Sequence, residues 1–213
     1  MRRIPTFLFI LFLAFSLLSC QKELSFENGS PGNNNLPSLL GNWKFLVLDV
    51  SVESSSTFDY GGIPGRIVAT YVATTQNNKG LLTVTADQMK TTDLGYTISA
   101  NVQLMTYLGG IPVDPQPHEE QLDFDVPSSS TSSDYQQIGS DSLYFPNGSI
   151  FDFPDTNGQQ LPGASDPLDA TYAISGDTLF IHSSINKSTT ATQNGTEYEI
   201  TQKVDGVATF IRQ

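Results

Sequence analysis

The sequence predicts an all-β domain of antiparallel strands, and three observations favour this fold class. Apolar and polar side chains alternate over several segments, as in strands with one buried and one solvent-exposed face. No stretch shows the 3.6-residue period of an amphipathic helix. Charged residues make up only 15% of the chain, while Ser, Thr, Asn and Gln are abundant, and this composition disfavours a helical bundle. The expected arrangement is an antiparallel barrel, with a β-sandwich as the alternative.

About nine or ten strands are expected after residue 38, joined mostly by turns. The clearest lies at residues 95–108, where Tyr96, Ile98 and Ala100 alternate with Thr97 and Ser99. The expected strands are residues 43–50, 66–74, 81–86, 95–108, 120–126, 142–153 (one or two strands), 170–175, 177–183, 195–204 and 207–212.

Turn-forming residues separate these segments. We expect turns at residues 77–80 (Asn-Asn-Lys-Gly), 175–177 (Ser-Gly-Asp) and 205–206 (Asp-Gly), because Gly and Asn tolerate the positive φ that tight turns need. Residues 127–139 and 154–167 are rich in Ser or in Pro and Gly and are expected to be loops.

Residues 1–19 have the pattern of a signal peptide. Arg2 and Arg3 precede an apolar run at residues 7–18, which has the length of a signal-peptide core and falls short of the roughly 18 apolar residues of a membrane span. The run ends in LLSC, which resembles the bacterial lipobox. In lipobox signals the cysteine thiol accepts the lipid and begins the mature chain. Cys20 is the chain's one cysteine, and it is the expected lipidation site.

Residues 20–38 are expected to be a lipidated, flexible tether, because they are rich in Asn, Gly and Ser and offer little to bury. Gln21-Lys22-Glu23 resembles the export tags of surface lipoproteins of Bacteroidota. The resemblance implies an anchor in the cell outer membrane, on its periplasmic or outer side. Two or three acyl chains of the palmitate type would hold firmly, since each buried CH₂ contributes about 0.8 kcal/mol.

The charge of the chain limits its partners. The formal net charge is −12 and becomes more negative once Arg2 and Arg3 are removed. Such a chain does not bind nucleic acid by counterion release. Anionic headgroups would also repel it, so the expected contact with the membrane is the lipid on Cys20.

Gly41-Asn42-Trp43 opens the first expected strand and resembles the Gly-x-Trp signature of lipocalins. The stretch from Gly176 also looks like the lipocalin-like domains of Bacteroidota lipoproteins. The resemblance covers residues 39–213 and implies a lipocalin-like barrel. In that family the tryptophan closes one end of the barrel and packs against a late arginine, a role that Arg212 would fill by cation–π contact.

Catalytic and metal sites are hard to build from this sequence. His118 is expected in a solvated, Pro-rich loop, and His182 lies on an expected strand, on the face opposite Leu179 and Ile181. Zinc needs three or four clustered ligands, and no Gly-x-Ser-x-Gly motif is present. We therefore expect no enzyme, cofactor or metal. A calcium site is the less remote alternative, on the acidic residues Asp114, Glu119, Glu120, Asp123 and Asp125, although alternating acids are usually an exposed strand face.

Two further sets of residues are candidates. Most of the aromatic residues are expected in the core, and some could line a ligand mouth: Tyr60, Tyr71, Tyr96, Tyr107, Tyr144, Phe145, Phe151, Phe153 and Tyr172. Ser142 and Thr178 stand in Asp-Ser/Thr-Leu sequences that fit the O-glycosylation pattern of Bacteroidota.

The expected function is that of a lipid-anchored cell-envelope protein whose barrel binds a small apolar or sugar-like ligand. The alternative is a non-enzymatic structural or protein-interaction lipoprotein with a filled core, because a barrel of about eight strands either holds one small ligand or is filled by its own side chains. The sequence leaves the ligand-binding residues and the oligomeric state open.

Overall fold

The computed structural model describes residues 38–148, 150, 166–193 and 196–213. The expected signal peptide, Cys20 and the tether up to residue 37 lie outside the described residues, as does most of the expected loop at 154–167. Residues 37–213 form a compact unit with its own apolar core, and a unit of this kind can fold independently.

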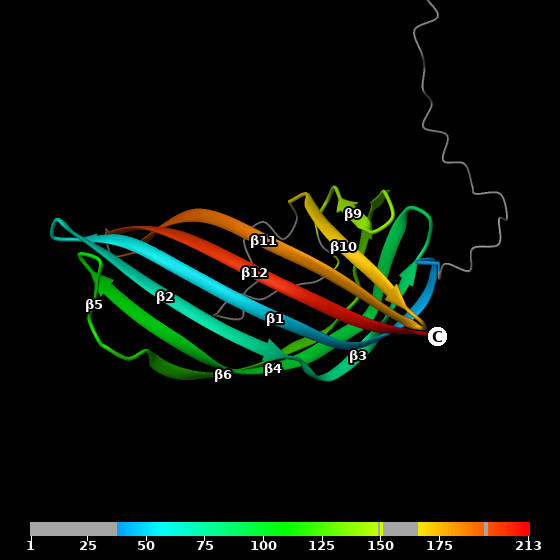
Figure 1. Cartoon of the computed structure of the whole chain (residues 1–213), viewed down its shortest axis with the longest axis horizontal. Helices are drawn as coiled ribbons and strands as arrows, with labels where there is room; N and C mark the ends of the chain where they lie inside the picture. Colours follow the sequence, from blue (N-terminus) through cyan, green and yellow to red (C-terminus); the bar gives the residue numbers. More distant parts are fainter. Residues whose placement is uncertain (1–37, 149, 151–165, 194–195) are drawn as a thin grey trace, which may run out of the picture. The chain divides into compact units, whose positions relative to one another are not determined.

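The predicted fold class is confirmed at the level of an all-β, antiparallel domain. The described residues contain no helix, and hence none long and apolar enough to cross a membrane. Twelve strands are present in this part of the chain, all in one sheet (Figure 1). They are β1 (Gly41–Tyr60), β2 (Ile63–Thr74), β3 (Gln76–Val84), β4 (Gln88–Leu108), β5 (Ile111–Pro112), β6 (His118–Ser129), β7 (Ser132–Asp134), β8 (Gln136–Ile138), β9 (Ser142–Phe145), β10 (Leu168–Ser175), β11 (Thr178–Gln193) and β12 (Thr196–Arg212).

The first and last strands of the domain are hydrogen-bonded neighbours. β1 pairs antiparallel with β12 from Trp43↔Arg212 to Thr57↔Glu199. On its other side β1 pairs first with β3 and then with β2. β2 and β3 therefore run end to end along one edge of β1, and β4 pairs with both of them.

The segment from β6 to β8 changes its neighbour at Tyr135. β6 and β7 both pair with β4, whereas β8 pairs with β9. Tyr135 stands between β7 and β8; its N–H donates to the Asp87 carbonyl at 2.9 Å and its hydroxyl to the Thr85 carbonyl at 2.7 Å. The prediction of a loop at residues 127–139 is therefore wrong. The Ser-rich composition hid β7 and β8, together with the buried side chains of Ser133 in β7 and of Tyr135 between the two strands.

The core lies between the facing surfaces of this sheet. Phe45 packs against Phe210 and Tyr96, with ring centroids 5.5 and 6.1 Å apart. The alternation predicted for β4 is present: Tyr96, Ile98, Ala100 and Val102 are buried, and the residues between them are half-buried or exposed. β4 also extends back to Gln88.

Two predicted turns are wrong and one is confirmed. Asp205 and Gly206 lie inside β12, paired on one side with Ser51 and Val50 and on the other with β11. Residues 77–80 lie inside β3, where they produce shifts in register instead of a reversal. The turn at residues 175–177 connects β10 to β11 as expected, and Gly176 there has a φ of +58°.

Position 80 requires glycine because of its backbone conformation and its short distance to β4. Its φ is +120°, and a Cβ at this position would lie 2.6 Å from the Cα of Leu94. Leu94 belongs to β4, so the backbones of β3 and β4 approach one another too closely here for any side chain. The glycine read as a turn signal thus marks a bulge.

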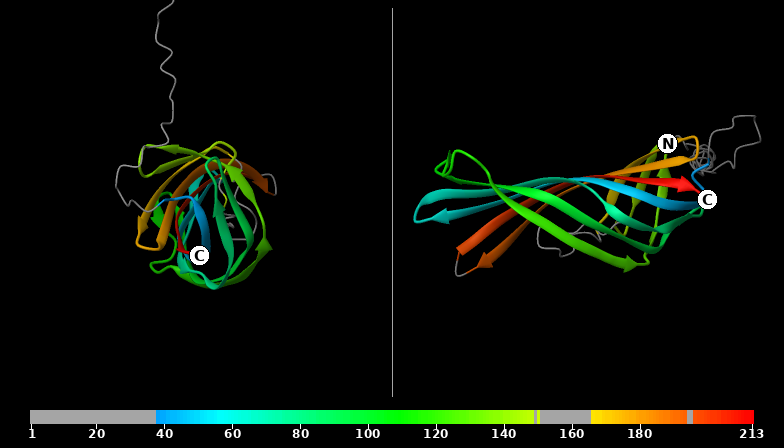
Figure 2. Two further views of the ribbon diagram at one scale, coloured as in Figure 1. Left: turned by 90° about the vertical axis from the view of Figure 1, so that its right-hand side faces the viewer. Right: turned by 90° about the horizontal axis from the view of Figure 1, so that it is seen from below.

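Five strands continue beyond the packed core. β1, β2, β4, β11 and β12 each have one end at the same end of the sheet, at the left of Figure 1 and again in the right-hand view of Figure 2. Phe58 and Tyr198 pack together in this extension, with ring centroids 5.7 Å apart. The domain therefore has a core end, where the chain enters at β1, and an extended end.

Candidate functional site

At the core end, Trp43 and Arg212 make the contact that the sequence predicts. They face each other across the β1–β12 ladder, which places the guanidinium carbon of Arg212 4.2 Å from the centre of the Trp43 ring. Trp43 is fully buried, and its indole N–H donates to the Leu39 carbonyl at 3.0 Å. A buried indole needs such a partner.

Arg212 also holds the segment that precedes β1. Its guanidinium donates to the carbonyl of Leu40 at 3.3 Å and to the carbonyl of Ser38. Gly41 has a φ of +137°, and a Cβ there would lie 3.2 Å from Nη1 of Arg212. Glycine at this position lets the guanidinium pass close to the backbone on its way to the indole. The three residues Gly41, Trp43 and Arg212 thus form one structural cluster.

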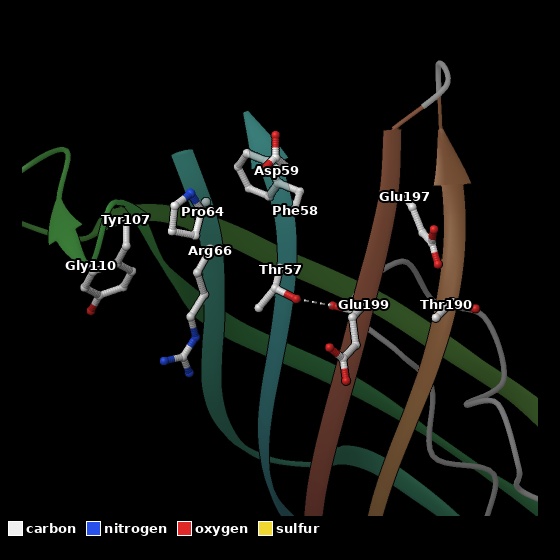
Figure 3. A pocket seen from close by; sticks show the side chains of 11 residues that line it. Thr57, Phe58, Asp59, Pro64, Arg66, Tyr107, Gly110, Thr190, Glu197 and Glu199 are labelled. Atoms are coloured by element: carbon white, nitrogen blue, oxygen red, sulfur yellow. Dashed lines mark hydrogen bonds between the residues drawn. The ribbon is translucent and has the colours of Figure 1, made fainter. Parts of the chain in front are cut away.

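The extended end carries an open groove of about 940 Å³. Figure 3 shows it from close by: Arg66 comes from β2, Glu197 and Glu199 from β12, and Thr57 from β1 between them. The groove is lined by Thr57, Phe58, Asp59, Pro64, Gly65, Arg66, Tyr107, Gly110, Thr190, Glu197 and Glu199. Three carboxylates against one guanidinium make it acidic, and Arg66 is also bonded to the Ser55 hydroxyl, by its Nε at 2.8 Å.

Two hairpin tips that contribute Pro64 and Gly110 to this groove carry the same four residues, which the sequence analysis missed. Gly-Gly-Ile-Pro occurs at residues 61–64, between β1 and β2, and at residues 109–112, between β4 and β5. All four glycines have positive φ, as two-residue hairpin turns require. A search for internal repeats would have found the signal.

The two histidines are far from a catalytic arrangement. His182 is exposed on β11, while Leu179 and Ile181 are buried on the other face, as predicted. His118 is the first residue of β6, so the prediction that it lies in a loop is wrong. Its Nε2 lies 3.5 Å from Glu120, and both side chains are largely exposed.

The acidic segment does not assemble a metal site within the part of the chain that is described. Asp114, Glu119, Glu120, Asp123 and Asp125 are all exposed, and no group of three His, Cys, Asp or Glu residues there could hold a metal ion. Glu119, Asp123 and Asp125 lie opposite the polar residues Gln103, Ser99 and Thr97 of β4, and Glu120 lies opposite Val102. The described geometry matches a solvated strand face.

Two tyrosines near the β7–β8 junction, Tyr135 and Tyr172, have a pKa above the ordinary tyrosine value. Burial raises the pKa of Tyr135, helped by nearby Tyr172 and Asp87. Burial also raises the pKa of Tyr172 against the opposing effect of Gln137, whose amide donates to the Tyr172 hydroxyl at 2.7 Å. Tyr135 serves the fold by its bond to Thr85, so we assign both groups to the structure of this junction.

The remaining candidates divide between core and surface. Tyr71, Tyr96 and Phe145 are buried as expected, and Tyr60 is exposed at a hairpin tip. Tyr107, Tyr144 and Tyr172 are half-buried, and Phe151 and Phe153 lie outside the described residues. Ser142 and Thr178 are the half-buried first residues of β9 and β11.

Comparisons of this chain with protein-family models, with curated proteins and with solved structures found no match. A function for the chain must therefore be inferred from the chemistry of its own residues.

Proposed function

We propose that this chain is a lipid-anchored protein of the cell envelope, attached to the outer membrane through acyl chains on Cys20. Its β-domain is a lipocalin-like barrel with a filled interior, and it acts through its surface as a non-enzymatic interaction module. The single observation that carries the surface role is the packing of the core.

The barrel is supported by the order of pairing. β1 joins β12, the ladder continues through β11, β10 and β9 to β8, and the chain runs from β8 back through Tyr135 into β7, which pairs with β4. β4 returns to β1 through β2 and β3. With β2–β3 and β6–β8 each taken as one interrupted strand, this circuit resembles an up-and-down barrel. The contact of Arg212 with Trp43 at one end has the form that lipocalins use.

A filled interior is supported by the size and burial of the side chains that face inward. Large residues from six different strands are almost completely inaccessible to solvent: Trp43, Phe45, Leu48, Leu82, Met89, Leu143, Phe145, Leu179, Ile181 and Phe210. A ligand pocket of this kind of fold needs some hundreds of Å³ of apolar space. The burial of these large side chains against one another supports a filled core over an interior ligand site.

A second candidate function rests on the groove at the extended end. Its volume suits a small molecule, and Tyr107 beside Arg66, Glu197 and Glu199 offers a ring and several hydrogen-bonding groups. Such a lining suits a polar, hydroxyl-rich ligand such as a sugar. In this case the ligand expected from the resemblance binds outside the barrel.

The anchor is tested by the full chain expressed in a Bacteroidota host, with Cys20→Ser as the variant and Ser19→Ala as the matched control. We expect labelled palmitate in the wild type and the control and none in Cys20→Ser, with an intact mass that places the modification on the first mature residue. An unlabelled wild-type chain with a bare thiol would overturn the anchor.

The surface role is tested by native mass spectrometry of residues 38–213 purified from the same host. We expect the mass of the protein alone. A small molecule that is bound by the wild type and lost in the double variant Arg66→Ala/Glu199→Gln would replace the surface role with the groove candidate. A small molecule that the double variant still binds would contradict the filled interior.

A further inference from the structure

The two Gly-Gly-Ile-Pro tips together form an exposed apolar surface. We call residues 60–65 and 107–113 the paired tip. Its outermost side chains are apolar or aromatic and strongly exposed: Tyr60 is 68% exposed, Ile63 49%, Ile111 70% and Val113 52%. Burying a side chain of this size is worth about 1.5–3 kcal/mol, so their shared exposure at one place indicates a surface that is covered by something else.

The two hairpins of the paired tip are held side by side. Gly65 pairs with Leu108 in the β2–β4 ladder, and the N–H of Gly109 donates to the Pro64 carbonyl at 2.8 Å. A Cβ on Gly109 would lie 3.8 Å from Cγ2 of Ile63. Both views of the ribbon show the two turns as neighbours at the extended end (Figures 1 and 2). They therefore form one continuous exposed surface, which reaches the rim of the groove through Pro64, Gly65, Tyr107 and Gly110.

The paired tip contains no charged residue: its sequences are YGGIPG and YLGGIPV. Tyr60 and Tyr107 begin the two segments, and tyrosine is amphipathic, with an apolar ring and a polar end that prefers an interface. The charged residues nearest in sequence are Asp59, Arg66 and Asp114, which lie just outside it.

The backbone of the paired tip exposes few free donors. Pro64 and Pro112 have no N–H. The N–H groups of Gly62, Gly109 and Val113 donate at 2.8 Å to the Asp59 carboxylate, the Pro64 carbonyl and the Thr106 carbonyl. In water an unpaired N–H group costs little, because water accepts its hydrogen bond. In an apolar medium each unpaired donor costs several kcal/mol.

We propose that the paired tip inserts into the interface of a lipid bilayer whose headgroups carry no net charge. An exposed apolar surface without charged residues, with N–H groups that are largely hydrogen-bonded, suits an apolar phase. Asp59, Asp114 and the net charge of −12 disfavour anionic lipid.

This contact is separate from the anchor on Cys20. The chain enters the domain beside Gly41 and reaches the paired tip only at the end of β1, which has 20 residues and spans roughly 60 Å at about 3.3 Å per residue. The proposal does not depend on lipidation, and its test is built without Cys20.

The experiment uses tryptophan fluorescence of residues 38–213, the compact unit with its own core. The one native tryptophan, Trp43, is fully buried, so an added tryptophan is the only exposed one. Tyr60→Trp places it in the paired tip. Val72→Trp is the matched control, because Val72 is 75% exposed on β2 and outside the paired tip. An N-terminal histidine tag holds each protein on phosphatidylcholine vesicles that contain a nickel-chelating lipid.

We expect a blue shift and quenching by brominated phosphatidylcholine for Tyr60→Trp and neither for Val72→Trp. Adding Ile63→Ser and Ile111→Ser should abolish both signals while the circular dichroism spectrum stays native. Replacing part of the lipid with phosphatidylglycerol should weaken them.

Water-like emission from Tyr60→Trp on the vesicles would overturn the proposal. Equal shifts at positions 60 and 72 would also overturn it, because they would show adsorption without a preferred surface. A shift that appears only when membrane proteins of the host are added would replace the bilayer with a protein partner. None of these results bears on palmitate labelling of Cys20, so the two proposals fail separately.

Discussion

Replacing Arg212 with alanine should lower the free energy of unfolding by about 2 kcal/mol. A guanidinium over an indole is worth about 1 kcal/mol when it is partly exposed, and Arg212 lies 4.2 Å from the Trp43 ring. Its two hydrogen bonds to the carbonyls of Ser38 and Leu40 are partly exposed and add about 0.5 kcal/mol each. For a domain of this size, the loss corresponds to a fall in Tm of roughly 6 °C.

Guanidinium titration of residues 38–213 measures this change. Trp43 is buried and the sole tryptophan, so its emission reports unfolding, and far-ultraviolet circular dichroism serves as the second probe. Arg212→Lys keeps the cation but loses the planar fork, and it should retain about half of the stabilisation. Arg66→Ala is the matched control, since Arg66 is exposed and bonded to a single hydroxyl, and its loss should be below about 0.5 kcal/mol.

Equal effects of the two arginine-to-alanine changes would refute the stabilising role assigned to Arg212. So would an Arg212→Ala domain within about 0.5 kcal/mol of the wild type, which falls inside the range of ordinary surface substitutions. A double-mutant cycle with Trp43→Phe then separates the contact between the two residues from the hydrogen bonds, because only the contact involves the ring.

Three further changes test other parts of the fold. Phe210→Ala should cost about 3–5 kcal/mol in the same titration, because the ring is fully buried against Phe45. Gly80→Ala should cost at least about 2 kcal/mol through its positive φ and its approach to Leu94, whereas alanine at the open, exposed Gly110 should cost less. Burial raises the pKa of Tyr135, so above about pH 10 the unfolded chain releases that proton first and stability falls as pH rises. Tyr135→Phe should make this fall shallower between pH 9 and 11 (roughly the ordinary tyrosine range), and an unchanged slope would contradict the assignment.

The sequence predicted those features that depend on local alternation. In β4 every second residue from Tyr96 to Val102 is buried, and the pattern shows it because one face of that segment is apolar. The pairing of Trp43 with Arg212 was also predictable, but only through the lipocalin resemblance, since no local pattern connects two residues so far apart.

The errors arose where pairing outweighs local preference. Asp205 and Gly206 favour a turn in isolation, but β12 is paired on both sides at this point, and two ladders of hydrogen bonds outweigh the preference of one dipeptide. Residues 127–139 look like a loop by composition, yet Ser133 and Tyr135 are buried. The paired tip was missed because the two Gly-Gly-Ile-Pro segments, which are 48 positions apart, were not compared with each other.

The pairing of β1 with β12 has a consequence for how the domain reaches its folded state. Leu40 and Arg212 are 172 positions apart in the chain yet share a hydrogen bond, so the contact order is high and folding is expected to be slow. In a chain that emerges from its N-terminus, β1 cannot pair with β12 until the last residues have been released. During that interval the backbone N–H and C=O groups along the unpaired edge of β1 are free to pair with a wrong strand, and a chaperone that binds extended chains would have its greatest effect there.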